Sequence, residues 1–89
     1  MKRAAKVDAN HAEIVEAFRK LGATVLDLSR VGGGCPDLLV GVRGVNILVE
    51  VKTARGTLRD SQQKFFDGWR GQCCVVRSVA EVIEIMRRR

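Results

Sequence analysis

The 89-residue chain contains no tyrosine, a single proline and only four aromatic side chains, three Phe and one Trp. None of the four lies in a segment patterned as a strand, which argues against the aromatic sheets that stack single-stranded nucleic acid. No apolar run approaches the length of a membrane span, and none follows the charged N-terminal residues. We therefore expect no membrane partner and a cytoplasmic, intracellular location.

Cysteine and histidine are also scarce, with three Cys and one His in the chain. Cys35, Cys73 and Cys74 contain no C-x-x-C pair, and His11 is the sole imidazole that could join them. This pattern predicts neither a disulfide framework nor a structural zinc site. The three thiols are expected to be small buried side chains in a reducing compartment.

Positive charge is present in excess. Sixteen Lys and Arg, eleven of them Arg, oppose ten Asp and Glu and give a net charge of +6. Guanidinium groups suit phosphate recognition, so we expect a duplex or branched nucleic acid as the partner. A chain of this length can hold one hydrophobic core. We expect one domain over residues 1–89, with its core at about 10–86 and basic tails at both ends.

Hydrophobic periodicity and turn signals predict seven elements. A capping signature at Asn10 and Glu13 begins a helix that Gly22 ends, and similar signals at Asp60 and Ser78 begin two more. Strands are predicted at 24–29, 38–42, 45–51 and 73–77. The order α-β-β-β-α-β-α predicts an α/β fold with a mixed sheet flanked by helices. We expect the aromatic stripe of the second helix to lie in the core: Phe65, Phe66 and Trp69.

The two central strands are joined by Arg43-Gly44, which predicts a two-residue hairpin turn. Directly opposed residues then have numbers that sum to 87, so Asp37 lies opposite Glu50. Opposed residues share one face of the sheet, with their Cβ atoms about 4.5–5.5 Å apart. A slip of one residue would break this arrangement. The hairpin therefore predicts two neighbouring carboxylates at its open end.

Lys52 adds a cation to this pair, because it lies two residues after Glu50 and points to the same face. Singly, Asp37 could cap a turn, and Glu50 with Lys52 could be an exposed ion pair. Two adjacent carboxylates repel each other, and a divalent ion such as Mg²⁺ or Mn²⁺ relieves this repulsion. Lys52 could then hold the attacking water and offset charge on phosphorus. The ordered set favours phosphodiester hydrolysis.

Pro36-Asp37 followed by Glu50-Val51-Lys52 resembles the motif of the PD-(D/E)xK nuclease superfamily. The intervening sequence is similar to that of the VRR-NUC family, the virus-type replication and repair nucleases. This resemblance extends from about residue 10 to residue 85. It is carried by four further features: Gly34–Gly41, Leu48–Lys52, Leu58 with Gln62, and Phe65 with Trp69.

The resemblance implies a restriction-endonuclease-like core and an endonuclease that depends on Mg²⁺ or Mn²⁺. It implies three metal ligands: Asp37, Glu50 and the backbone carbonyl of Val51. Lys52 would be the catalytic lysine. Gln62 would steady Lys52 or the scissile phosphate, and the acid that the family carries in its first helix falls on Glu13.

The resemblance also implies a substrate and an assembly. Stand-alone members of phage type are homodimers that cut four-way DNA junctions, which suggests a phage protein in a bacterial host. Two alternatives stay open: a flap-cutting or restriction-type nuclease of the same fold, and a non-catalytic basic DNA-binding module. Preferred sequence, cut position and the number of metal ions are not indicated.

Several individual roles have alternatives as well. Glu13 could instead be the capping partner of Asn10. Gln62 or its neighbour Gln63 could cap the second helix rather than serve the site. Four arginines in predicted loops are expected to contact DNA phosphates: Arg30, Arg43, Arg55 and Arg59. Of these, Arg55 and Arg59 are expected to make the most direct contacts.

Overall fold

The computed structural model describes residues 8–88, which form a mixed four-stranded sheet with three helices. In this part of the chain the elements are α1 His11–Lys20, β1 Thr24–Asp27, β2 Leu38–Val42, β3 Val45–Val51, α2 Asp60–Gly68, β4 Cys73–Val76 and α3 Val79–Arg88. The sheet order is β1-β2-β3-β4, with β4 parallel to β3 and the other pairs antiparallel. The predicted α/β class and element order are confirmed. No helix among residues 8–88 is long and apolar enough to span a membrane.

The β2–β3 hairpin has the register that its two-residue turn predicts. Val42 pairs with Val45, and the two turn residues between them have φ angles of 46° and 81°. Both angles are positive, as a type I′ turn requires. The same register places Asp37, one residue before β2, across from Glu50 on β3.

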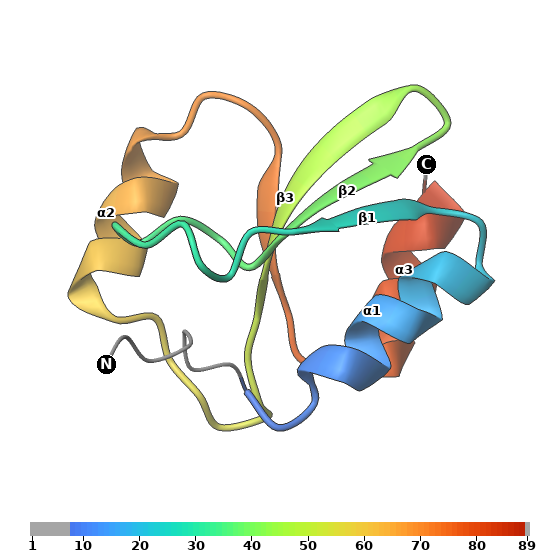
Figure 1. Ribbon diagram of the computed structural model, residues 1–89, viewed down its shortest axis with the longest axis horizontal. Coiled ribbons are helices and arrows are strands. Elements are labelled where there is room, and N and C mark those ends of the chain that lie inside the picture. The colour runs from blue at the N-terminus through green and yellow to red at the C-terminus, as the bar shows by residue number, and fades with distance from the viewer. Residues whose placement is uncertain (1–7, 89) are drawn as a thin grey trace.

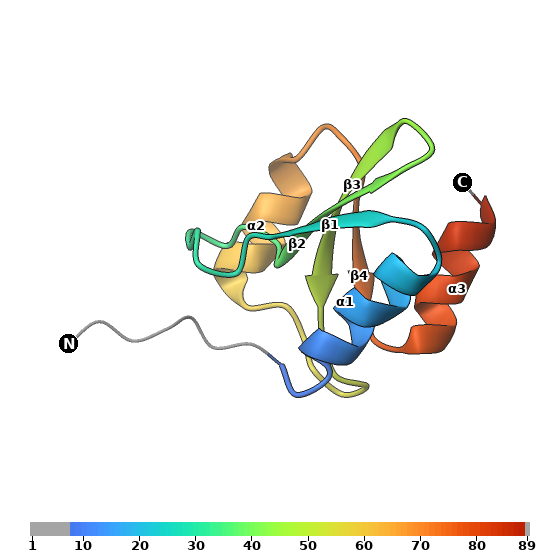
Figure 2. The ribbon, with the colours of Figure 1, turned by 45° about the vertical axis from the view of Figure 1, so that its right-hand side comes forward.

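The helices lie on both sides of the sheet (Figures 1 and 2). α1 and α3 lie side by side on one face, and α2 lies on the other side. The hydrophobic core fills the space between the sheet and the α1–α3 pair, where Phe18 and Val82 are fully buried. On β3, Val49 and Val51 point into this core. Glu50 between them therefore faces the α2 side of the sheet.

α2 does not contribute its aromatic side chains to the core, so this expectation was wrong. Phe65 and Phe66 are partly buried, whereas Trp69 is 46% exposed and stacks on Phe65 with ring centroids 5.1 Å apart. The buried side chain of this helix is Gln62. The reason is that the sheet face toward α2 carries the charged Glu50. The helix therefore meets the sheet through a polar contact, the hydrogen bond between Gln62 and Glu50.

Side-chain hydrogen bonds shift two of the predicted boundaries. Asp27 accepts bonds from the N–H and the hydroxyl of Ser29, at 2.8 and 2.6 Å, which ends β1 two residues early. At the other end of the chain, α3 continues to Arg88, whose guanidinium bonds to Glu84 at 3.2 Å. Residues 87 and 88 are thus helical rather than part of a tail. The basic segment predicted at the N-terminus, residues 1–7, lies outside the described residues.

Candidate active site

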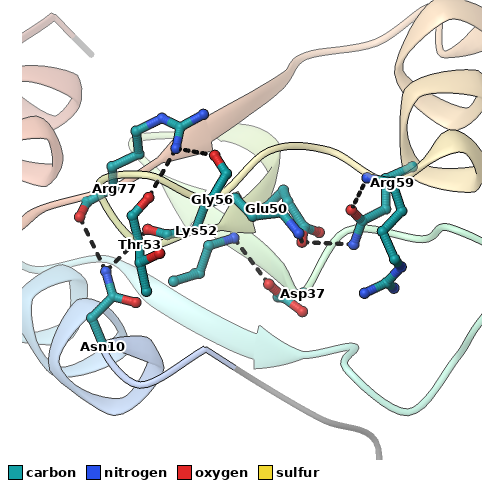
Figure 3. Close-up of polar contacts among 10 residues, drawn as sticks. Asn10, Asp37, Glu50, Lys52, Thr53, Gly56, Arg59 and Arg77 are labelled. Carbon is teal, nitrogen blue, oxygen red and sulfur yellow. Dashed lines mark hydrogen bonds and ion pairs between the residues drawn. The ribbon is translucent and has the colours of Figure 1, made fainter.

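The predicted charged residues converge where β2 begins and β3 ends (Figure 3). Asp37 accepts a hydrogen bond from the backbone N–H of Val51, with 2.9 Å between Oδ2 and N. Glu50 and Lys52 are only 2% and 6% exposed, and Nζ of Lys52 lies 3.4 Å from Oε2 of Glu50. We refer to Asp37, Glu50 and Lys52 as the charged cluster.

Burial raises the pKa of both carboxyl groups. It raises the pKa of Glu50 to about 7, and the charge of Asp37 raises it as well, while Lys52 has the opposite effect. Burial also raises the pKa of Asp37, and the hydrogen bond from Val51 partly offsets this. One ammonium group therefore does not compensate the buried carboxyl of Glu50 together with the partly buried carboxyl of Asp37, and the cluster has capacity for further positive charge.

Gln62, in the first turn of α2, is held at both ends of its amide. Its Oε1 accepts a hydrogen bond from the backbone N–H of Arg59 at 2.8 Å, and its Nε2 donates to Oε2 of Glu50 at 2.9 Å. Because the helix start fixes the oxygen, the amino group is directed at Glu50. Gln63 bonds instead to Asp67 at 2.8 Å. Gln62 thus fills the capping role considered for it, and its amino group contacts the charged cluster through Glu50. Its role in steadying Lys52 or the scissile phosphate stays a prediction.

The charged cluster opens into a cleft of about 390 Å³ between the sheet and the start of α2. One side is the glycine turn, residues 32–34, which passes against the backbone of Ser61. A Cβ on Gly34 would lie 2.2 Å from the Ser61 carbonyl oxygen, and the φ of 81° also favours glycine. Cys35 lines the cleft and is partly rather than fully buried. The missing side chain at Gly34 lets the turn and α2 close this side.

Comparison with known proteins places this geometry in a family. The model of the VRR-NUC domain matches residues 2–83. The chain belongs to the VRR-NUC family. A solved structure described as a VRR_NUC domain has 32% sequence identity and a TM-score of 0.71, covering 86% of this chain and 89% of that chain. No curated protein matches the chain. The predicted family and its restriction-endonuclease-like core are confirmed, which makes this a nuclease domain of the PD-(D/E)xK superfamily.

Asp8 is an acidic residue of this VRR-NUC cleft that the sequence analysis missed. It lines the cleft, and its charge adds to the effect of burial in raising the pKa of Asp37. Its carbonyl accepts a hydrogen bond from the N–H of His11 at 3.0 Å, in the turn that leads into α1. Helical periodicity could not identify a residue that precedes the helix. The one available signal was an acid two positions before Asn10.

Glu13 lies away from the charged cluster. It is exposed and lines a groove between α1 and α3, together with Leu21 and Ile83. The expected cap of α1 is not formed by the Asn10 side chain, which makes no capping hydrogen bond. Although Glu13 lies in the first turn of α1, it lines the groove toward α3 and not the cleft. The structure therefore does not bring Glu13 together with Asp37.

The four arginines predicted to contact DNA occupy different parts of the molecule. Arg59 lines the cleft, and Arg30 and Arg55 are exposed in the loops that flank it. Arg43 lies in the hairpin turn at the opposite end of β2 and β3, where its guanidinium donates to the carbonyl of Met86. Three of the four therefore lie near the cleft, and Arg43 does not.

The charged cluster fits a divalent metal ion. Oε1 of Glu50 is buried and has no hydrogen-bond partner, so one carboxylate oxygen is left for a cation. Asp37 lies beside it, and the Val51 carbonyl could supply a third oxygen. Within residues 8–88, no three His, Cys, Asp or Glu side chains are arranged to hold a metal by themselves. Mg²⁺ and Mn²⁺ suit such a site, because they retain waters and need few carboxylates.

Proposed function

We propose that the protein is a metal-dependent endonuclease that hydrolyses phosphodiester bonds in branched DNA. The observation that carries the proposal is the buried, unpartnered Oε1 of Glu50 beside Asp37 and Lys52. A buried polar atom without a partner disfavours folding, and metal binding by a nuclease gives a reason for it to be present. The net charge of +6 provides general attraction to DNA.

Each residue around the charged cluster has its own role in this proposal. Asp37, Glu50 and the Val51 carbonyl would hold Mg²⁺ or Mn²⁺, which when bound supplies a Lewis acid and a water of lowered pKa. Lys52, with Nζ 3.4 Å from Glu50, would orient the attacking water and offset charge on phosphorus. Gln62 fixes one oxygen of Glu50 through its 2.9 Å hydrogen bond and leaves the other oxygen available.

We propose Asp8, and not Glu13, as the additional acid of the site. Asp8 lines the cleft, whereas Glu13 lies in the groove between α1 and α3. A carboxylate beside the metal ligands can accept hydrogen bonds from waters around the ion. Asp8→Asn is therefore expected to lower the cleavage rate at least tenfold, and Glu13→Gln to leave it unchanged. The opposite ranking would return the role to Glu13.

The proposed assembly is a homodimer. One chain offers one cleft, whereas two-fold symmetry would present two clefts to two strands of similar geometry. The partly exposed aromatic face of α2 supplies apolar surface of the kind that homodimer interfaces bury. Sedimentation equilibrium should give twice the chain mass of 9.8 kDa. A monomer that cleaves at full rate would remove the dimer from the proposal.

A cleavage assay tests the activity directly. A four-way junction is compared with a flap, a linear duplex and a single strand of matched sequence, with Mg²⁺, Mn²⁺ or EDTA. We expect junction cleavage that EDTA abolishes and that Lys52→Ala loses without losing junction binding, because Lys52 is 6% exposed. Preferred cleavage of flaps or linear duplex would instead assign the flap-cutting or restriction-type activity. Binding without cleavage under either ion would indicate a non-catalytic DNA-binding module.

A further inference from the structure

Two polar side chains outside the charged cluster, Asn10 and Arg77, form hydrogen bonds with the backbone just after β3 (Figure 3). The side-chain amide of Asn10 donates to the carbonyls of Lys52 and Arg77, at 3.1 and 3.0 Å. Val51 and Val76 are register partners in β3 and β4, so the two carbonyls belong to the next pair of residues. Asn10 therefore bridges the ends of two parallel strands.

This bridge completes the fixation of the Lys52 backbone. Its N–H already donates to the carbonyl of Val76 at 3.0 Å, and its carbonyl accepts the bond from Asn10. Both partners lie outside the turn that follows Lys52. The position of the lysine backbone therefore does not depend on how that turn is held.

The turn that follows, residues 53–56, is held by Arg77 instead. One terminal nitrogen of the Arg77 guanidinium donates to the carbonyl of Thr53 at 2.8 Å and also to the carbonyl of Gly56. The N–H of Gly56 closes the turn by donating a hydrogen bond to the carbonyl of Thr53 at 3.1 Å. The backbone N–H of Arg77 bonds to Glu81 at 2.7 Å, so the guanidinium extends from a fixed point at the start of α3.

Arg55 lies inside this turn, between the two carbonyls that Arg77 holds. Its side chain is exposed and makes no hydrogen bond or ion pair with residues 8–88. The turn leads on to Arg59, which lines the cleft. A cation on a turn that is already ordered loses less conformational freedom when it binds a phosphate than one on a mobile loop.

We propose that Arg77 is a positioning residue that holds the turn 53–56 so that Arg55 meets a phosphate of the DNA substrate. This inference rests on the proposed function, because it takes DNA as the ligand. Arg77 acts through Arg55 and not by contacting the DNA. It therefore controls substrate affinity, whereas the separate bridge by Asn10 controls the placement of Lys52 and hence the rate of the chemical step.

A double-mutant cycle measures this dependence. Binding of a fluorescent four-way junction is titrated in EDTA for the parent, Arg55→Ala, Arg77→Met and the double variant, at several salt concentrations. Each single variant should raise Kd about tenfold. Each should also weaken the salt dependence, so that the negative slope of log K against log salt is smaller in magnitude by about 0.9. The double variant should bind as well as Arg55→Ala, because the contact has already been lost. Arg77→Lys should restore part of the affinity, since an ammonium can donate to both carbonyls.

Three controls separate positioning from other effects. Arg87→Met removes an exposed positive charge of α3 away from the turn, so it should change Kd less than twofold. Single-turnover cleavage with the enzyme in saturating excess over the DNA should be unchanged in Arg77→Met. Asn10→Asp, which keeps the shape but cannot donate to the two carbonyls, should slow it about tenfold with unchanged Kd. Circular dichroism and thermal melts verify that each variant is folded.

Four results would overturn the inference. A double variant that binds about a hundredfold more weakly than the parent would mean that Arg77 contacts DNA itself. Unchanged affinity in Arg77→Met, with weaker binding in Arg55→Ala, would mean that the turn needs no support. An equal loss in Arg87→Met would reduce the effect to net charge, and a parent that binds no DNA would remove the inference altogether. A parent that binds but cleaves nothing would overturn the proposed nuclease, while the cycle would still decide the role of Arg77.

Discussion

The protonation of Glu50 should make the stability of the metal-free protein depend on pH, and Glu50→Gln should remove that dependence. Burial, together with the charge of Asp37, raises the pKa of Glu50 to about 7 from the ordinary value of 4.5. Between these values the folded protein retains a proton that the unfolded chain has released. The stability that Glu50 contributes is therefore fully present below pH 4.5 and is lost as the pH rises through 7.

The size of this effect follows from the two pKa values. At 1.36 kcal/mol per pKa unit, moving a carboxyl from 4.5 to about 7 corresponds to roughly 3 kcal/mol. Glu50 is 2% exposed, so solvent screening does not reduce this figure much. The amide side chain introduced by Glu50→Gln does not titrate in this pH range. The substitution also removes a negative charge next to Asp37. Lys52 loses an ion-pair partner in the variant, so the pH dependence is the reliable observable and the absolute stability is not.

Urea unfolding at pH 5, 6, 7 and 8 in EDTA measures the prediction. The parent should lose about 2.5 kcal/mol over this range, and Glu50→Gln should lose less than about 1 kcal/mol. Glu16→Gln is the matched control, because Glu16 is exposed on α1 and forms a surface ion pair with Lys20 at 3.9 Å. Mg²⁺ at pH 8 should restore the parent and not Glu50→Gln. If Glu50→Gln loses stability as steeply as the parent, Glu50 is not the titrating group.

Further predictions concern metal affinity, Gln62 and the glycine turn. Mn²⁺ affinity measured by calorimetry should rise up to tenfold per pH unit below pH 7, because Glu50 must release its proton before the ion binds. Gln62→Glu preserves the acceptor for Arg59 but sets a carboxylate against Glu50, so the cleavage rate should fall at least a hundredfold while circular dichroism shows an intact helix. Gly34→Ala puts a Cβ 2.2 Å from the Ser61 carbonyl and strains a φ of 81°, so thermal unfolding should show a loss of about 1–3 kcal/mol.

The hairpin and the charged cluster could be predicted from sequence because their geometry depends on local rules. A two-residue turn fixes the register, and strand alternation then fixes which side chains share a face. These two rules place Asp37 opposite Glu50, and Lys52 beside them, without knowledge of the rest of the fold. The family motif adds Gln62, whose spacing from the strand the structure explains by its bond to Glu50.

The residues that were misplaced depend on contacts that no periodic pattern encodes. The helical periodicity of α1 shows which side of the helix is apolar. It does not show that Glu13 faces α3 rather than the cleft. Asp8 reaches the cleft through the path of the chain before the helix begins. Asn10 has a residue type that is common at helix N-caps. Its side-chain amide instead donates hydrogen bonds to the carbonyls of Lys52 and Arg77, 42 and 67 positions away in the sequence. In each case a long-range contact outweighs the local signal.

The position of α2 connects these observations. An amphipathic helix normally takes its place by burying its apolar face, but the aromatic face of α2 is left partly exposed and its buried side chain is Gln62. The helix is therefore located by one amide that joins its first turn to Glu50, and by the contact of the glycine turn with its backbone at Ser61. The proposed metal site, the helix start and the cleft wall thus depend on the same few contacts. A substitution that frees Gln62 should disturb all three together, whereas the core between the sheet and the α1–α3 pair contains none of them.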